Sequence, residues 1–158
     1  MKPSERWGKE RVALASEGLR ASGFLRLRVH GESMLPTLVP GDVVEIASCA
    51  IEEVRAGEIV LARREERFYL HRFVARRGDG FVLRGDSMPR RDPMFHARDL
   101  LGKVARVDSS TKAQTAAFKS RFWHRPLGIL CCYSGAVRAA ILKFRRPRPQ
   151  PDALPNTA

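Results

Sequence analysis

A serine and a histidine are the residues with which this chain could carry out nucleophilic chemistry. Ser33 lies in Gly31-Glu32-Ser33-Met34-Leu35-Pro36, and a serine hydroxyl attacks only when a neighbouring base takes its proton. Among four histidines, His71 shares a predicted strand face with Tyr69 and Phe73, and imidazole exchanges a proton near neutral pH. Taken alone, two such residues 38 positions apart are explained more simply as a capping serine and a half-buried strand histidine.

Five short motifs that occur in a fixed order favour the catalytic interpretation of these residues over the simpler one. Residues 31–37, followed by Pro40-Gly41-Asp42-Val43-Val44, resemble the nucleophile box of type I signal peptidases and of the LexA-like self-cleaving repressors. Four later segments resemble, in turn, the Gly-Asp-Ile-Val strand, the strand of the general base, the Gly-Asp-Asn box and the closing strand of these families. They are Ala56–Ala62, Leu70–Val74, Leu83–Ser87 and Leu101–Val104. The resemblance covers roughly residues 24–107 and implies a serine endopeptidase.

The resemblance also implies roles for individual residues. Bacterial type I signal peptidases and LexA-like proteins use lysine as the base, whereas His71 stands there as in the endoplasmic-reticulum and archaeal type of signal peptidase. That type is similar in placing a functional aspartate six residues after the Asp of its Gly-Asp-Asn box. Counting from Asp86 leads to Asp92, which would orient the imidazole, while Asp86 and Gly85 would support the site. Whether Asp86 or Asp92 orients His71 stays open at this point.

The oxyanion of the reaction needs preorganised donors, and the backbone N–H of Ser33 is the natural one in a tight turn. Some signal peptidases carry a hydroxyl donor two positions before the nucleophile, but this chain has Gly31 there, which excludes a side-chain donor. Met34 and Pro36 are interpreted as packing and turn residues. No metal or other cofactor is expected.

The hydrophobic pattern predicts a mainly β protein with a short N-terminal helix. Ser4 can cap a helix that runs to Arg20, with Gly18 or Gly23 at its end. Six strand candidates follow, each bounded by turn residues. They cover 24–30, 42–47, 58–63, 67–75, 80–84 and 100–107. Short strands without helices between them predict a LexA/signal peptidase-like antiparallel β-barrel or folded sheet rather than a parallel α/β fold.

We expect three parts: an N-terminal helix (1–23), a signal-peptidase-like catalytic domain (24–108), as the resemblance implies, and a basic tail (109–158), which differs from the rest in charge. Residues 1–108 hold 20 Lys/Arg against 16 Asp/Glu, whereas 109–158 hold 9 against 1. Within the tail, 126–142 is apolar, and the Pro-rich end is predicted to be disordered. The apolar segment fits either an interfacial helix on anionic lipid or a helix docked on the sheet. Three cysteines cannot form an even disulfide framework.

Three functions are weighed. The favoured one is a signal-peptidase-like endopeptidase that cleaves an extended peptide or leader after a small residue. No apolar segment precedes Ser33, so no N-terminal signal or transmembrane helix is expected, and a dedicated peptide substrate is favoured over bulk secretory processing. Localisation is left open between cytoplasm and membrane. The alternatives are a LexA-like self-cleaving regulator, for which 23 residues before the first strand are too few to form a DNA-binding domain, and a non-catalytic peptide-binding homologue. Nucleic acid is not an expected partner.

Overall fold

The computed structural model describes residues 3–65, 67–108, 139 and 143, with the side chains of the helix described from Val12 onward. The described part consists of one helix, seven strands and two short 3₁₀ helices. In chain order these are α1 (Pro3–Ser22), β1 (Phe24–Arg28), β2 (Val43–Ser48), η1 (Ile51–Glu53), β3 (Ile59–Arg64), β4 (Arg67–Arg77), β5 (Gly80–Arg84), β6 (Phe95–His96), η2 (Ala97–Asp99) and β7 (Leu100–Asp108). The predicted apolar segment 126–142 and the basic end lie outside the described residues, apart from single positions.

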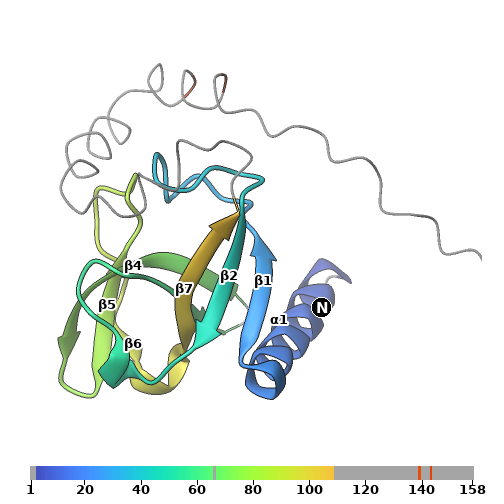
Figure 1. Ribbon diagram of the computed structural model, residues 1–158, viewed down its shortest axis with the longest axis horizontal. Coiled ribbons are helices and arrows are strands. Elements are labelled where there is room, and N and C mark those ends of the chain that lie inside the picture. The colour runs from blue at the N-terminus through green and yellow to red at the C-terminus, as the bar shows by residue number, and fades with distance from the viewer. Residues whose placement is uncertain (1–2, 66, 109–138, 140–142, 144–158) are drawn as a thin grey trace, which may run out of the picture.

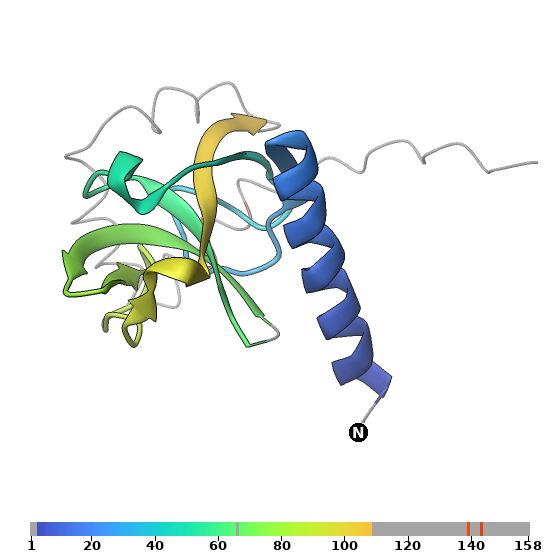
Figure 2. The ribbon, with the colours of Figure 1, turned by 90° about the horizontal axis from the view of Figure 1, so that it is seen from below.

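All seven strands belong to one antiparallel sheet in the order β1-β2-β7-β3-β4-β5-β6. The mainly β prediction is therefore confirmed, with an open strand order in place of a closed barrel. In Figure 1, β1, β2 and β7 lie side by side next to α1, and β4, β5 and β6 lie on the other side. Figure 2 shows α1 running along one side of the sheet. The six predicted strands all occur, and β6 is an additional one.

The alternation predicted for the first strand is present in β1. Leu25 and Leu27 are half-buried against the core, and Arg26 and Arg28 are exposed on the opposite face. β4 is different because one face is buried, at His71 and Phe73, and the opposite face is half-buried, at Leu70, Arg72 and Val74. The buried face of β4 therefore carries a polar side chain, His71.

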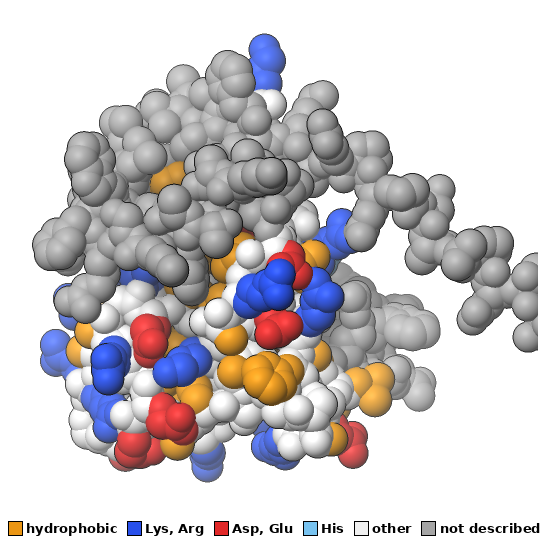
Figure 3. Space-filling model, viewed as in Figure 1, with side chains coloured by type: hydrophobic (Ala, Val, Ile, Leu, Met, Phe, Trp, Pro, Cys, Tyr) orange, Lys and Arg blue, Asp and Glu red, His pale blue; other side chains and the backbone are white. Residues whose placement is uncertain are grey.

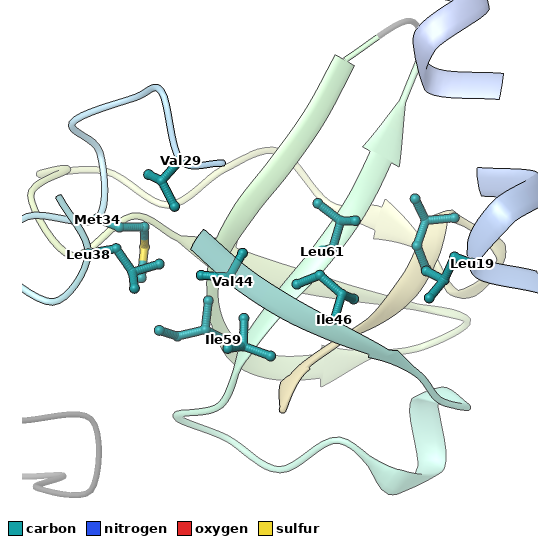
Figure 4. Close-up of a cluster of buried hydrophobic side chains, with 10 residues drawn as sticks. Leu19, Val29, Met34, Leu38, Val44, Ile46, Ile59 and Leu61 are labelled. Atoms are coloured by element: carbon teal, nitrogen blue, oxygen red, sulfur yellow. The ribbon is translucent and has the colours of Figure 1, made fainter. Parts of the chain in front are cut away.

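Two hydrophobic clusters form the core and position the loops around the candidate site. The first includes Leu19 of α1 and, from the loop between β1 and β2, Met34 and Leu38, so the segment that carries Ser33 is anchored in the interior. Figure 4 shows Met34 and Leu38 at one end of this cluster and Leu19 at the other, with side chains of β2 and β3 between them. The second cluster contains the stacked rings of Phe73, Phe81 and Phe95.

The loop between β1 and β2 is closed by its own backbone. Val29 donates to the carbonyl of Asp42 at 2.8 Å, and Gly41 donates to the carbonyl of Val29 at 2.7 Å. The Asp42 carboxylate, which is buried, accepts a hydrogen bond from the N–H of Val39 at 2.9 Å. Gly41 has a φ of 99°, a conformation that favours glycine. The Pro-Gly-Asp sequence thus returns the chain to β2 at a defined point after the Ser33 turn.

The described surface is mixed in charge. In the view of Figure 3, Lys/Arg and Asp/Glu side chains are interspersed, and neither sign forms a continuous patch on this face. This matches the near balance of charged residues over positions 1–108. Most of the net charge of +12 therefore belongs to residues beyond the sheet.

Candidate active site

Ser33 and His71 are far apart in the chain but in contact in the folded structure. Ser33 lies in the turn between β1 and β2, and His71 lies in the middle of β4, where its residue is only 8% exposed. The Nε2 atom of His71 is 2.9 Å from the Oγ of Ser33. This distance is within hydrogen-bond reach, so the imidazole can accept the hydroxyl proton directly.

The other ring nitrogen of His71 contacts Asp92. The distance from Nδ1 to Oδ2 of Asp92 is 2.6 Å, and the two side chains are 10% and 13% exposed. Asp92 lies in the loop between β5 and β6, where its N–H donates to the carbonyl of Leu83 at 2.9 Å. With Nδ1–H donating to the carboxylate, Nε2 is left as the acceptor that faces the serine, which is the tautomer that general-base catalysis needs.

Asp86 is engaged elsewhere, with Arg72. The guanidinium of Arg72 donates through Nε to Oδ1 of Asp86 at 2.7 Å and through Nη2 to Oδ2 at 2.6 Å, a bidentate pair. Oδ2 also accepts from the hydroxyl of Thr37 at 2.5 Å, and Nη1 of Arg72 donates to the carbonyl of Gly57 at 2.6 Å. One half-buried network thereby joins the nucleophile loop, the turn before β3, β4 and the segment after β5.

Gly85 and Ser87 hold the backbone of the nucleophile. Ser87 donates its N–H to the carbonyl of Ser33 at 2.9 Å and its hydroxyl to the carbonyl of Glu32 at 2.7 Å. A Cβ added to Gly85 would lie 2.6 Å from the carbonyl oxygen of Ser33. Only glycine allows the two backbones to approach this closely. Ser87 and Thr37 were not singled out from the sequence, although both lie inside the quoted motifs, because a hydroxyl that bonds to a distant loop leaves no local pattern.

Gly31 lies beside the nucleophile without contributing a side chain. A Cβ at this position would be 4.0 Å from the Oγ of Ser33, an ordinary van der Waals distance. The N–H of Ser33 forms no hydrogen bond to an acceptor within the described residues.

The remaining histidines do not reach Ser33 in the described structure. His30 is exposed, and Nδ1 of His96 lies 3.7 Å from a carboxylate oxygen of Asp79 at the surface. His124 falls outside the described residues. No group of three or more His, Cys, Asp or Glu side chains suited to a metal ion occurs in 3–65 and 67–108. Over the same residues, α1 is not apolar enough to cross a membrane, and no other helix has the length.

A serine, a histidine and an aspartate in one hydrogen-bonded chain, held by a β-sheet, is the arrangement of a serine hydrolase. Comparison with protein families matches residues 3–105 to the Peptidase S24-like family. The chain belongs to this family, so it is a serine peptidase of the LexA/signal peptidase type. A search of curated proteins finds no match.

Proposed function

We propose that this protein is a serine endopeptidase in which Ser33 is the nucleophile, His71 the general base and Asp92 the residue that orients the base. The observation that carries the proposal is the position of one imidazole between a serine hydroxyl at 2.9 Å and a carboxylate at 2.6 Å. Membership of the Peptidase S24-like family supports the same reaction class.

The reaction follows from this geometry. As Oγ of Ser33 attacks the scissile carbonyl carbon, its proton passes to Nε2 of His71, and the carbonyl oxygen becomes an oxyanion. The Asp92 carboxylate stabilises the imidazolium, which then protonates the leaving amine as the C–N bond breaks. A water molecule, deprotonated by the same imidazole, hydrolyses the acyl-enzyme and regenerates Ser33. The N–H of Ser33, for which no acceptor is found within the described residues, is the proposed oxyanion donor.

The base supports a finer assignment within the superfamily. A histidine in place of lysine is the feature by which the site resembles the endoplasmic-reticulum and archaeal type of signal peptidase. We place the chain in this His-using branch, with an extended peptide or leader as substrate, bound by strand addition and cleaved after a small residue. Gly31 fits this proposal because it leaves space open beside the nucleophile.

The experiment is peptide cleavage with paired controls. Purified protein is incubated with extended peptides that vary in the size of the residue before each bond, and the products are identified by mass spectrometry. Ser33→Ala and His71→Ala should each abolish cleavage, whereas Ser48→Ala and His30→Ala, at exposed positions, should keep it. Cleavage that survives either of the first two changes unaltered contradicts the proposal.

Two further measurements separate the alternative functions. A non-catalytic peptide-binding homologue would bind peptides without covalent labelling of Ser33 by a fluorophosphonate, while a peptidase is labelled. A LexA-like self-cleaving regulator would cut its own chain at a rate independent of protein concentration, and it would leave added peptides intact.

A further inference from the structure

The segment that carries Asp92 has little regular structure of its own. Residues 88–94 form neither helix nor strand, and Met88, Pro93 and Met94 are exposed. One backbone hydrogen bond, from Asp92 to Leu83, ties Asp92 to β5. Because a carboxylate on an irregular exposed loop can adopt many positions, its 2.6 Å contact with His71 needs further support.

Arg64, at the end of β3, supplies such support. Its Nη2 donates to the carbonyl of Pro93 at 3.1 Å and also to the carbonyl of Met94. These two carbonyls follow Asp92 directly in the chain. Within the described residues, Arg64 is the side chain that donates hydrogen bonds to the backbone of this segment.

The same guanidinium also lies over Phe95. The Cζ atom of Arg64 is 4.0 Å from the centroid of the Phe95 ring, within the range of a cation–π interaction. Phe95 is fully buried, stacks on Phe81 at 5.4 Å and meets the edge of Tyr69 at 5.3 Å. Arg64 therefore holds three consecutive residues, 93 to 95, against a fixed part of the core.

This aromatic cluster extends to the base. The ring of Tyr69 lies edge-on to His71, with a centroid distance of 6.0 Å. His71 and the loop that carries Asp92 thus contact the same group of rings. His71 does so through Tyr69, and the loop does so through Phe95 and Arg64. β3 and β6 are not neighbours in the sheet, so the Arg64 side chain links two strands that no backbone ladder joins.

We infer that Arg64 is a positioning residue that holds the Asp92 carboxylate on His71. The inference rests on the proposed catalytic roles of His71 and Asp92. Arg64 touches neither reacting atom, and it acts by fixing the backbone that follows Asp92. In Arg64 the nitrogen that donates to both carbonyls, Nη2, is a different atom from the Cζ carbon that lies over the ring, whereas lysine has one charged nitrogen that would have to make both contacts.

The kinetic test compares Arg64→Met with Arg63→Met. Arg63 is adjacent on the same strand, points to the opposite face and makes no hydrogen bond to the Asp92 loop within the described residues. Arg63→Met is therefore a control that removes the same charge from the same strand. Arg64→Met should lower kcat/KM by about 10- to 100-fold, because a displacement of about 1 Å in a catalytic group has this effect. Arg64→Lys should recover little, and Arg63→Met should stay within about twofold of the parent protein.

A double-mutant cycle with Asp92→Asn tests the route of action. If Arg64 acts through Asp92, the Arg64→Met change should have almost no further effect on kcat in the Asp92→Asn protein. A merely structural arginine would cost the same factor in both proteins, and that result would overturn the inference.

A spectroscopic test separates this inference from the proposed function. The proton between Nδ1 of His71 and Asp92 should give a low-field resonance in the proton NMR spectrum, assigned by its loss in His71→Ala. It should broaden or shift in Arg64→Met and stay unchanged in Arg63→Met. An unchanged resonance in Arg64→Met contradicts the positioning role, even if the parent protein cleaves peptides. If the resonance is lost in Arg64→Met but the parent protein cleaves no peptide, the positioning role is supported and the proposed function is contradicted.

Discussion

Asp92 and His71 are 21 positions apart in the chain, yet Oδ2 of the carboxylate lies 2.6 Å from Nδ1 of the imidazole. Asp86 is closer to His71 in the chain, at 15 positions, but it is paired with Arg72 instead. The two aspartates of one short segment therefore have different surroundings and different expected roles.

Asp92→Asn should lower kcat by about 10³- to 10⁴-fold with little change in thermal unfolding, because an amide can donate to Nδ1 and hold the wrong tautomer of His71. The measurement is steady-state cleavage of a peptide that the parent protein cuts in the assay proposed above. Asp79→Asn, at a largely exposed carboxylate near His96, is the matched control and should keep full activity. Equal loss of activity in both variants would contradict the proposal that Asp92 orients His71.

Asp86→Ala should destabilise the fold, because it leaves the Arg72 guanidinium without its bidentate partner. The side chains of this pair are 26% and 9% exposed, so the cost should be roughly 2–4 kcal/mol in the free energy of unfolding. Asp108→Ala breaks the pair with Arg26, whose side chains are 61% and 39% exposed, and should cost about 0–1 kcal/mol. Urea unfolding of both variants measures the contrast, and equal costs would contradict it.

Gly85→Ala and Gly18→Ala should change stability in opposite directions. The added methyl at position 85 would lie 2.6 Å from the backbone oxygen of Ser33, so the nucleophile turn must move, at a cost of roughly 1–3 kcal/mol and with loss of peptide cleavage. Gly18 lies within α1 with nothing within 4 Å of an added Cβ, and alanine there should stabilise by roughly 0.5–1 kcal/mol. A Gly85→Ala protein with parental stability and activity would disprove the close approach.

Cys49 should react slowly with alkylating reagents at neutral pH. Burial raises the pKa of the Cys49 thiol, an effect that the positive charge of Lys103 partly opposes. The thiolate, which is the reactive form, is therefore less populated than in a free cysteine. Iodoacetamide labelling over a pH series measures this in a Cys131→Ser, Cys132→Ser background, with the unfolded protein as the reference. A folded protein that reacts at the unfolded rate would contradict the prediction.

The same shift predicts the sign of a pH effect on stability. Above the ordinary thiol pKa the unfolded chain loses the Cys49 proton while the folded chain keeps it, so the folded state binds more protons. The contribution of Cys49 to the free energy of unfolding should fall as pH rises through this range and level off above the raised pKa. In the Cys49→Ala protein this part of the pH dependence should be absent.

Much of the fold could be predicted from local patterns, and β6 shows where such patterns stop. β1 alternates apolar and basic residues, and the strands beginning at Val43, Ile59 and Gly80 each follow a glycine turn or a Pro-Gly pair. β6 has two residues, Phe95 and His96, which are too few to show a period. It pairs with Gly80 and Phe81, and a Cβ at Gly80 would lie 2.2 Å from the carbonyl oxygen of Phe95. That contact depends on a neighbour 15 residues away.

By itself the sequence determined the mainly β fold, the turn that presents Ser33 and the strand face that carries His71, because alternation and turn residues act over a few neighbouring positions. Only the tertiary structure decided which carboxylate lies against the imidazole, because Asp86 and Asp92 occupy the same polar loop and differ in what faces them. The loop presents Asp86 to the Arg72 guanidinium and Thr37, and it presents Asp92 to Nδ1 of His71. The contacts of Arg64 with Pro93 and Phe95 likewise join residues about 30 positions apart in the chain. No local pattern around position 64 predicts them.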